Sequence, residues 1–216
     1  MAAAKGSRIY VIAGVNGAGK SSIGGATFRE FGAEYYNPDE AASRMLARNP
    51  ALSPTDANSA AWHQGVRLLR RAISERKDFA FETTLGANTI PRLLQEAAAQ
   101  GIEIDVWYVG LANAQLHIDR VEARVRRGGH AIARELIERR FDQSRINLID
   151  LLPHLTELRV HDNSVDADPA TGKSPNPKLL LHMKADKIQN LQDLKDTPDW
   201  AKPIVATALK VYKARR

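Results

Sequence analysis

Short apolar segments alternate with longer amphipathic segments along most of this chain. Residues 8–13 (RIYVIA) and 102–111 (IEIDVWYVGL) are apolar runs rich in β-branched and aromatic side chains, and they predict buried strands. Three shorter apolar runs predict further strands at residues 34–37, 79–82 and 158–161. Capping residues, glycines and prolines delimit predicted helices at residues 20–31, 53–76, 89–100, 113–127 and 133–152.

This alternation of strands and helices predicts an α/β fold. Parallel strands joined through helices need right-handed crossovers, which cover both faces of the sheet. We therefore expect a P-loop NTPase-type three-layer sandwich around a mainly parallel five-stranded sheet, with a core at residues 1–165. The helix pair at about residues 113–152 is broken by Gly128 and Gly129, so it is a candidate lid. Residues 166–216 are expected to form a C-terminal extension packed on the core.

The composition limits the class of protein. Of the 216 residues, 44% are hydrophobic and 26% are charged, which suits one globular core with a small appendage. The absence of cysteine excludes disulfides, thiolate nucleophiles and cysteine zinc sites. The apolar runs are much shorter than a membrane span, and the first residues lead directly into a strand. We therefore expect a cytoplasmic protein without membrane association.

The basic charge of the chain points to an anionic ligand. The net charge is +6 and the pI is near 9.6, which suits a binder of nucleic acid or of polyphosphates. The arginines concentrate between residues 120 and 145, whereas aromatic residues make up only 6% and are not interleaved with them. A stacking platform for nucleic acid needs such interleaving. The pattern therefore favours a polyphosphate ligand and argues against nucleic acid.

One segment carries a complete phosphate-binding motif. Residues 14–21 (GVNGAGKS) match the pattern G-x-x-x-x-G-K-[ST] between a predicted strand and a predicted helix. Lys20 should reach the β- and γ-phosphates, and Ser21 should place its hydroxyl on Mg²⁺ as the metal ligand. The expected nucleotide-binding residues are Gly14, Asn16, Gly17, Ala18, Gly19, Lys20, Ser21 and Ser22. The motif therefore predicts binding of ATP or GTP together with Mg²⁺.

Two carboxylates follow predicted strands at the edge where this P-loop lies. Asp39 comes just after residues 34–37 and can accept a proton from a substrate hydroxyl, or it can cap the helix that follows. Glu82 ends the next predicted strand, and Thr84 adds a hydroxyl two residues later. A carboxylate at this position can bind substrate hydroxyls or hold a magnesium-bound water. Because ligands of parallel sheets bind at the carboxyl ends of strands, both carboxylates are candidate site residues.

A stripe of arginines marks one face of a predicted helix. Arg120, Arg124 and Arg127 are spaced i, i+4 and i+7, so they share that face. Arginines on a mobile helix can close over a nucleotide and neutralise charge on a transferring phosphoryl group. The alternative is a solvated helix face with ordinary ion pairs. His130 follows the glycine pair and can donate to phosphate. Two other histidines are interpreted as structural, namely His63 and His117.

Five segments together resemble a known family. They are GVNGAGKSS from Gly14, NPDEAA from Asn37, FETTL from Phe81, RVEARVRRGGHAI from Arg120 with RRFDQSRINL after it, and HDNS from His161. The P-loop is shared by very many proteins, whereas FETTL followed by R-V-x-x-R-V-x-x-G-G-H is much more specific. On these segments the chain resembles the zeta-toxin-like P-loop kinases, in particular their compact bacterial chromosomal members.

The resemblance implies an activity and partners. It implies a nucleoside-kinase-like sheet and transfer of a γ-phosphoryl group to a hydroxyl, with UDP-N-acetylglucosamine as the acceptor of the best known members. The small chain leaves less room for so large an acceptor. Kinship with toxins implies an antitoxin protein as a partner, and a housekeeping role is equally open.

The resemblance also implies roles for individual residues. Lys20 and Ser21 bind the phosphates and Mg²⁺, and Asp39 is the base toward the acceptor hydroxyl. Glu82 and Thr84 face the acceptor. Arg120 matches a lid arginine, and the candidates for the second are Arg124, taken as catalytic, with Arg127 and His130, taken as substrate-binding.

Three hypotheses of function follow. The leading one is a magnesium-dependent kinase that moves the γ-phosphoryl group of ATP or GTP to a hydroxyl of a small molecule. The second is a nucleotide-binding switch or ATPase without a small-molecule acceptor. The third is a kinase that acts on nucleic-acid ends, which the basic charge allows.

Overall fold

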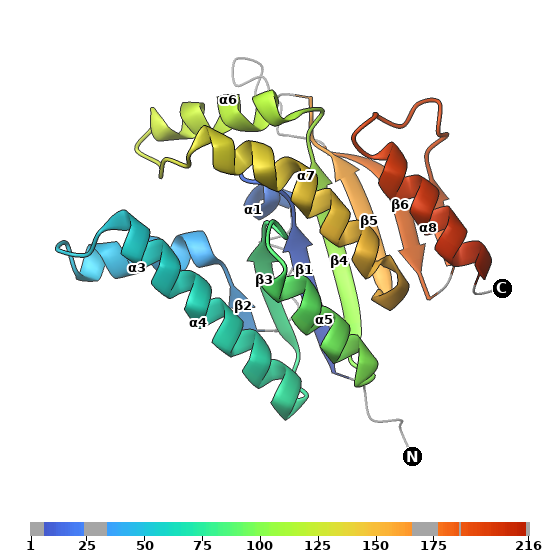
Figure 1. Cartoon of the computed structure of the whole chain (residues 1–216), viewed down its shortest axis with the longest axis horizontal. Helices are drawn as coiled ribbons and strands as arrows, with labels where there is room; N and C mark the ends of the chain where they lie inside the picture. The colour runs from blue at the N-terminus through green and yellow to red at the C-terminus, as the bar shows by residue number, and fades with distance from the viewer. Residues whose placement is uncertain (1–6, 24–33, 166–176, 186, 215–216) are drawn as a thin grey trace.

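The computed structural model describes residues 7–23, 34–165, 177–185 and 187–214. Within these residues, one seven-stranded sheet has the order β2-β3-β1-β4-β5-β6-β7 (Figure 1). Its strands are β1 (Arg8–Ala13), β2 (Glu34–Tyr36), β3 (Phe79–Thr83), β4 (Glu103–Gly110), β5 (Glu157–Asp162), β6 (Lys178–Lys184) and β7 (Lys187–Leu191). The helices are α1 (Lys20–Ile23), α3 (Pro38–Arg48), α4 (Pro54–Glu75), α5 (Thr89–Ala99), α6 (Ala114–Val125), α7 (Arg134–Leu151), the 3₁₀ helix η1 (Leu152–His154) and α8 (Lys202–Ala214).

The mainly parallel α/β sheet predicted from the sequence is confirmed. The five predicted strands are β2, β3, β1, β4 and β5, and they pair in parallel in that order. Two further strands, β6 and β7, continue the sheet in antiparallel pairing and were not predicted. Of the helix predicted at residues 20–31, the first turn is α1 and the remainder lies outside the described residues.

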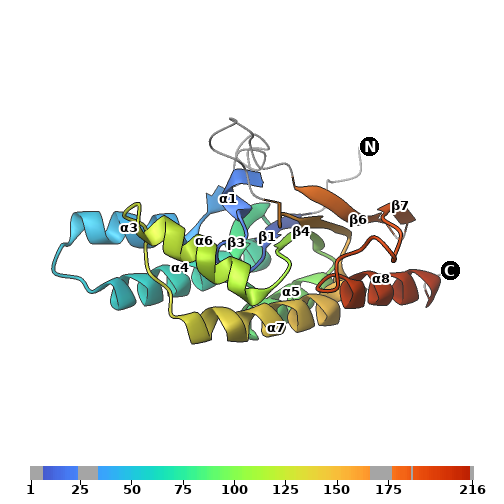
Figure 2. The same cartoon turned by 90° about the horizontal axis from the view of Figure 1, so that it is seen from above.

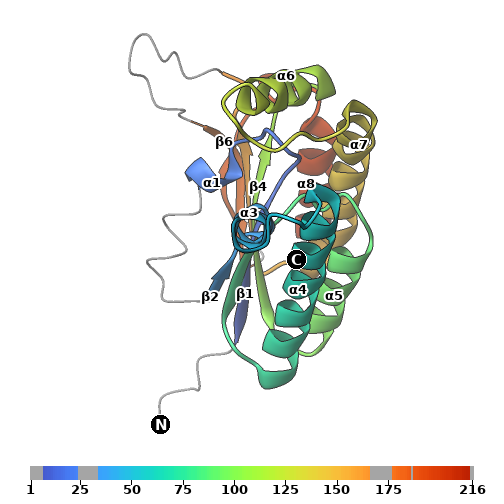
Figure 3. The ribbon, with the colours of Figure 1, turned by 90° about the vertical axis from the view of Figure 1, so that its left-hand side faces the viewer.

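The helices are distributed unequally over the two faces of the sheet. Helices α4, α5, α7 and α8 lie side by side on one face, whereas α1 lies on the opposite face (Figures 2 and 3). Helix α6 lies beyond the tips of the parallel strands, and α7 starts near its far end and runs back along the sheet (Figure 1). The carboxyl ends of the strands are therefore flanked by α6 and the start of α7.

The helix-covered face of the sheet carries the main hydrophobic core. Val11 on the central strand pairs in register with Phe81 on β3 and Val106 on β4. All three side chains are buried, and helices α4, α5, α7 and α8 each add buried apolar residues to the same cluster. Because side chains alternate along a strand, the residues between these positions face the opposite side. The strands β1, β3 and β4 are therefore held in register by one shared core.

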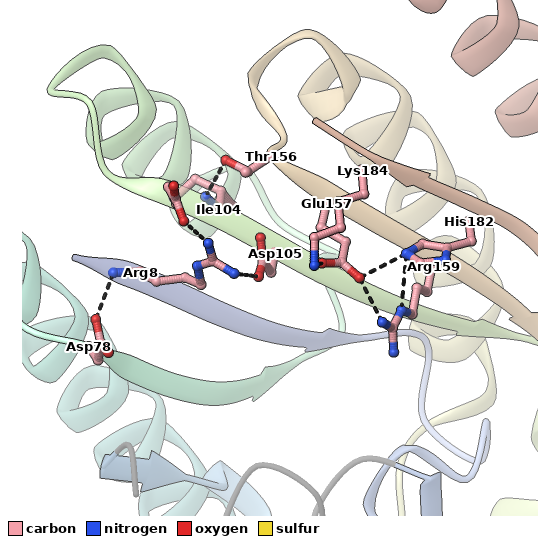
Figure 4. Close-up of polar contacts among 10 residues, drawn as sticks. Arg8, Asp78, Ile104, Asp105, Thr156, Glu157, Arg159, His182 and Lys184 are labelled. Carbon is pink, nitrogen blue, oxygen red and sulfur yellow. Dashed lines mark hydrogen bonds and ion pairs between the residues drawn. The ribbon is translucent and has the colours of Figure 1, made fainter. Parts of the chain in front are cut away.

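The opposite face of the sheet carries a polar network around two buried carboxylates, Asp105 and Glu157 (Figure 4). Arg8 Nη1 donates to Asp105 Oδ2 at 3.0 Å. Glu157, which pairs with Asp105 in the β4–β5 register, makes ion pairs with Arg159 at 2.8 Å and Lys184 at 3.0 Å, and its Oε1 lies 2.9 Å from Nε2 of His182. Since His182 and Lys184 belong to β6, this network ties the antiparallel strands to the parallel part of the sheet.

In the part of the chain that the structure describes, no helix combines the length and the apolar character that a membrane crossing needs.

Candidate active site

The P-loop connects the end of β1 to α1. Gly14, Gly17 and Gly19 all have positive φ angles, of 141°, 82° and 86°. At Gly14 a Cβ atom would lie 2.1 Å from the carbonyl oxygen of Val109, so no side chain fits. Lys20 folds back over the loop, and its Nζ donates to the carbonyl oxygen of Gly14 at 2.9 Å. The loop therefore has the compact form that backbone phosphate binding requires.

Helix α6 holds one side of the P-loop. The carbonyl oxygen of Asn16 lies 2.8 Å from Nδ1 of His117, which must carry the proton because a carbonyl only accepts. Burial lowers the pKa of His117 to about 4, so the ring is neutral at physiological pH. A Cβ atom on Gly17 would lie 2.7 Å from the carbonyl oxygen of His117. His117, interpreted as structural from the sequence, therefore supports the nucleotide site directly.

Lys20 lies in a desolvated and highly charged position. Burial lowers the pKa of Lys20, and the carboxylates of Glu82 and Asp39 oppose that shift. The cations of Arg124 and Arg140 act in the same direction as burial. Groups of both signs therefore converge on Lys20, and an anionic ligand would be attracted by the cations on more than one side.

Helix α7 contributes an arginine that the sequence analysis did not select. Arg140 Nη1 donates to Asn16 Oδ1 of the P-loop at 2.8 Å. Burial lowers the pKa of Arg140, and Asp39 opposes this shift. Arg140 belongs to the RRFDQSRINL segment, so the arginine cluster was visible in the sequence, whereas its contact with residue 16 was not. Arg140 thus links the P-loop, Asp39 and α7.

Glu82 is held beside the predicted metal ligand. Ser21 Oγ donates to Glu82 Oε2 at 3.2 Å, and the hydroxyl of Tyr35 donates to Glu82 Oε1. Asn37 Nδ2 lies 3.5 Å from Ser21 Oγ. Within the described residues there is no group of three His, Cys, Asp or Glu side chains that would hold a metal ion. A hydroxyl beside a carboxylate nevertheless fits Mg²⁺, because this ion takes its remaining ligands from phosphate and water.

A cavity of about 450 Å³ opens at the carboxyl ends of β1 and β3. Several predicted site residues line it, namely Asn16, Lys20, Asp39, Glu82, Thr84 and His130. Apolar side chains line other parts, among them Trp62, Phe81, Ile90 and Leu136. Two further lining residues were not predicted from the sequence, namely Trp62, which is 39% exposed, and Arg139. Basic, acidic and apolar groups therefore meet in one cavity, which we call the main cavity.

Asp39 faces the main cavity from the first turn of α3. The alternative role of Asp39 as the helix cap is wrong, because Asn37 is the N-cap and its Oδ1 accepts from the backbone N–H of Asp39 at 2.9 Å. The carboxylate is thereby free of a capping bond. Its Oδ2 lies 3.9 Å from Arg124 Nη1, and the side chain is 65% exposed. Asp39 is accessible to a ligand in the cavity.

The lid, which comprises α6, α7 and the turn between them, reaches across the main cavity. Arg124 Nη2 donates to the carbonyl oxygen of His130 at 3.1 Å. The ring of His130 lies 2.7 Å from the side-chain amide of Asn58 on α4, which joins the lid turn to the other side of the cavity. Two contacts from the lid, at Asp39 and at Asn58, therefore close over the cavity.

The remaining predicted residues occupy other positions. Arg120 lies on the α6 face next to the P-loop. A Cβ atom built on Gly17 would be 3.5 Å from the Cβ atom of Arg120. Arg127 is exposed and is not among the described residues that line the main cavity. The side chain of Ser22 lies outside the described part of the chain. Arg124 of this stripe pairs with the predicted base, Asp39, at 3.9 Å.

The fold and this site define the class of P-loop kinases. The chain belongs to the zeta toxin family, whose model matches residues 3–166. Family and fold together support a nucleotide-dependent kinase. An uncharacterized protein of Haemophilus influenzae is 30% identical over 129 residues, which cover 59% of this chain and 88% of that protein.

Solved structures with the same fold are much more distant in sequence. A chain of the AvrRxo1-ORF1:-ORF2 complex with ATP has a TM-score of 0.65 and 13% identity, and the match covers 94% of this chain but only 64% of that chain. The chromosomal PezAT toxin-antitoxin system of Streptococcus pneumoniae gives a TM-score of 0.56 and 14% identity, covering 99% of this chain and 87% of that chain. At these identities the likeness shows the fold.

Proposed function

We propose that this protein transfers the γ-phosphoryl group of ATP or GTP to a hydroxyl of a small molecule, with Mg²⁺ as the cofactor. One observation carries the proposal: the P-loop lysine Lys20 and the carboxylate of Asp39 line the same cavity. A phosphate donor on the P-loop and a proton acceptor beside an acceptor molecule are the two halves of a kinase site.

The proposed reaction uses the residues as follows. Asp39 accepts the proton of the acceptor hydroxyl while the oxygen of that hydroxyl forms the new bond to the γ-phosphorus. The bond between this phosphorus and the β–γ bridging oxygen breaks, so the nucleoside diphosphate leaves with the electron pair. Lys20, Arg124 and Arg140 neutralise charge that spreads over the transferring group. Ser21 and Glu82 would hold the Mg²⁺, which supplies further charge neutralisation on the phosphates.

The acceptor is proposed from the lining of the main cavity and from the family. Thr84 and Asn58 offer hydrogen bonds, whereas Trp62 and Phe81 offer aromatic surface to a ring. These groups suit a hydroxylated molecule that carries a ring. UDP-N-acetylglucosamine, the acceptor implied by the resemblance to zeta-toxin-like kinases, is therefore the first compound to test.

The partners follow from the same reasoning. The PezAT system pairs a toxin with an antitoxin, and the AvrRxo1 complex also contains two components. We propose an antitoxin protein as the partner of this chain. Because the proposed reaction consumes a nucleoside triphosphate, we place it in the cytoplasm, where these nucleotides are abundant.

The test is transfer from γ-labelled ATP and GTP to a panel of nucleotide sugars, nucleosides and RNA ends. Asp39→Asn removes the base and should lower transfer at least about 100-fold, while nucleotide binding persists. Glu40→Gln is the matched control, since Glu40 lies next to Asp39 on α3 and does not belong to the described lining of the cavity. Full transfer by Asp39→Asn would remove Asp39 from the mechanism, and nucleotide consumption independent of every acceptor would favour the ATPase alternative.

A further inference from the structure

Asn163 contacts the P-loop from the carboxyl end of β5. It follows β5, and its side chain is only 4% exposed. Its backbone N–H donates to the carbonyl oxygen of Gly110 at the end of β4, at 3.0 Å. Its side-chain Nδ2 donates to the carbonyl oxygen of Ala18 in the P-loop at 2.9 Å. The residue is thus held by the sheet and holds the loop in turn.

The bond from Asn163 fixes the direction of one peptide group. In a planar trans peptide the C=O and the following N–H point in opposite directions. Because the C=O of Ala18 points to Asn163, the N–H of Gly19 points away from it. Gly19 has φ +86°, and a Cβ atom there would lie 2.6 Å from Asn163 Nδ2, so the loop backbone rests directly on the carboxamide. P-loops bind phosphate through such N–H groups.

The turn that carries Asn163 is itself held by the C-terminal part of the chain. Asp162 Oδ1 accepts from Trp200 Nε1 at 3.2 Å and from the hydroxyl of Ser164. Trp200 is 3% exposed, and a Cβ atom on Gly110 would lie 2.4 Å from its ring. Residue 200 lies between β7 and α8, outside the residues that match the family model. A segment beyond the kinase core therefore contacts the turn next to the P-loop.

We propose that Asn163 is a positioning residue of the nucleotide site, which aims the Gly19 N–H at the nucleotide phosphates and is buttressed by Trp200. The inference rests on the proposed function, because it assigns the phosphates of a bound nucleotide to this loop. Asn163 does not touch the reacting atoms. It acts through the Ala18–Gly19 peptide, so it should affect nucleotide affinity and leave the acceptor side unchanged.

The first test is Asn163→Ala, with ATP and ADP dissociation constants measured by a fluorescent nucleotide analogue in displacement. Loss of a buried hydrogen bond to the loop should raise the dissociation constants of both nucleotides about tenfold, while the KM of the acceptor stays the same. Asn147→Ala is the matched control. Asn147 is also a buried asparagine whose Nδ2 donates to a backbone carbonyl, that of Leu85 at 2.6 Å, away from the P-loop. Equal nucleotide affinity in the two variants would overturn the proposal.

A second variant separates positioning from a loss of stability. Asn163→Asp keeps the shape, but an ionised carboxylate cannot donate to the Ala18 carbonyl, whereas a protonated one can. Burial at this position raises the pKa of a carboxyl group, so the ATP affinity of this variant, relative to the unmodified protein, should recover as the pH falls from about 8 to about 5. A merely structural defect would show no such recovery. A pH-independent ratio would contradict the proposal even if Asn163→Ala failed to fold.

Two more variants complete the test. Trp200→Phe keeps an aromatic ring but loses the N–H donor to Asp162. We expect it to raise the ATP dissociation constant about threefold. No change would overturn the buttressing role. Lys20→Ala tests the proposed function separately: if it leaves ATP binding intact, the nucleotide site itself is wrong. If Lys20→Ala abolishes binding while Asn163→Ala and Asn163→Asp bind normally, the inference alone fails.

Discussion

At the scale of residues, electrostatic interactions among a few charged side chains dominate the candidate site. Lys20, Arg124 and Arg140 lie close enough to influence one another, and Asp39 offsets part of their mutual repulsion. Burial of Lys20 and Arg140 strengthens their interactions with these charges relative to the same interactions at the surface. A transferring phosphoryl group would bring the negative charge that this arrangement lacks.

Arg140→Ala should lower phosphoryl transfer about 100-fold, because it removes a cation that contacts the P-loop at Asn16. The measurement is kcat with saturating nucleotide and acceptor, together with the nucleotide dissociation constant. Arg145→Ala is the control on the same helix, since Arg145 stacks over Phe141 at 4.1 Å and pairs with Asp142. If Arg140→Ala kept more than half of the activity, Arg140 would have only a structural role.

The sequence predicted the site residues that belong to local motifs. Lys20 and Ser21 follow from the spacing of one loop, and Asp39 and Glu82 follow from their position after strands. The anchors of the loop were not predictable in this way, because Arg140 reaches Asn16 across 124 residues. A contact of this kind depends on how helices pack, and no local pattern of one sequence encodes it.

At the scale of elements, the end of α6 and the turn before α7 face Asp39 and Asn58 across the main cavity. Arg124 near the end of α6 contacts Asp39, and His130 in the turn contacts Asn58. Each is partly exposed, so each contributes little to the stability of the fold. Weak contacts of this type suit an element that must open for substrates and close for the reaction.

Asn58→Ala should loosen the closed lid because it removes the partner of His130. We expect the acceptor KM to rise about threefold to tenfold and water to compete better, so that nucleotide hydrolysis without acceptor increases. Both quantities are measured in one coupled assay of diphosphate release. Asn88→Ala is the control, since the Asn88 side chain makes no capping bond. An unchanged KM and unchanged hydrolysis would show that this contact does not hold the lid.

At the scale of the whole molecule, the sheet separates an apolar core from a charged face. Asp105 on that face is buried, and burial is the main cause that raises its pKa to about 6, with Arg8 opposing and Glu157 reinforcing the shift. The ionised carboxylate is therefore disfavoured in the folded protein. Its folded pKa lies above the unfolded value, so for this acid the folded state gains stability as the pH falls from about 6 to about 4.

Asp105→Asn imitates the neutral acid and should raise the free energy of unfolding at pH 7.5 by about 1 to 2 kcal/mol, with the gain shrinking below pH 6. The estimate allows for the lost ion pair with Arg8. Urea unfolding at several pH values measures both effects, and groups common to the two proteins cancel in the difference. Asp142→Asn, with a side chain 72% exposed, should change stability by less than about 0.5 kcal/mol. A destabilised Asp105→Asn at pH 7.5 would show that the Arg8 pair outweighs burial.

The five parallel strands of the sheet were predicted from the sequence, whereas the antiparallel strands β6 and β7 were not. Strands β1 and β4 contain continuous apolar runs at residues 9–13 and 106–110, which is how buried parallel strands appear in sequence. Strand β7 (KIQNL) is mostly exposed at the sheet edge and lacks such a run. Strand β6 does carry a short apolar run, Leu179–Leu181, which was not predicted as a strand, and the ion pair of Lys184 with Glu157 helps to hold it.

The contacts that hold the P-loop come from residues much later in the chain, so they determine when this loop can fold during synthesis. The partners of Asn16 and Ala18 lie 101 and 145 residues further along the chain, at His117 and Asn163. A ribosome releases the N-terminal loop first, long before either anchor exists. Strand β1 also waits for both of its neighbours, β3 and β4. A growing chain is therefore expected to stay without a formed nucleotide pocket until its last parallel strand has emerged, so an unfinished product would have no kinase activity.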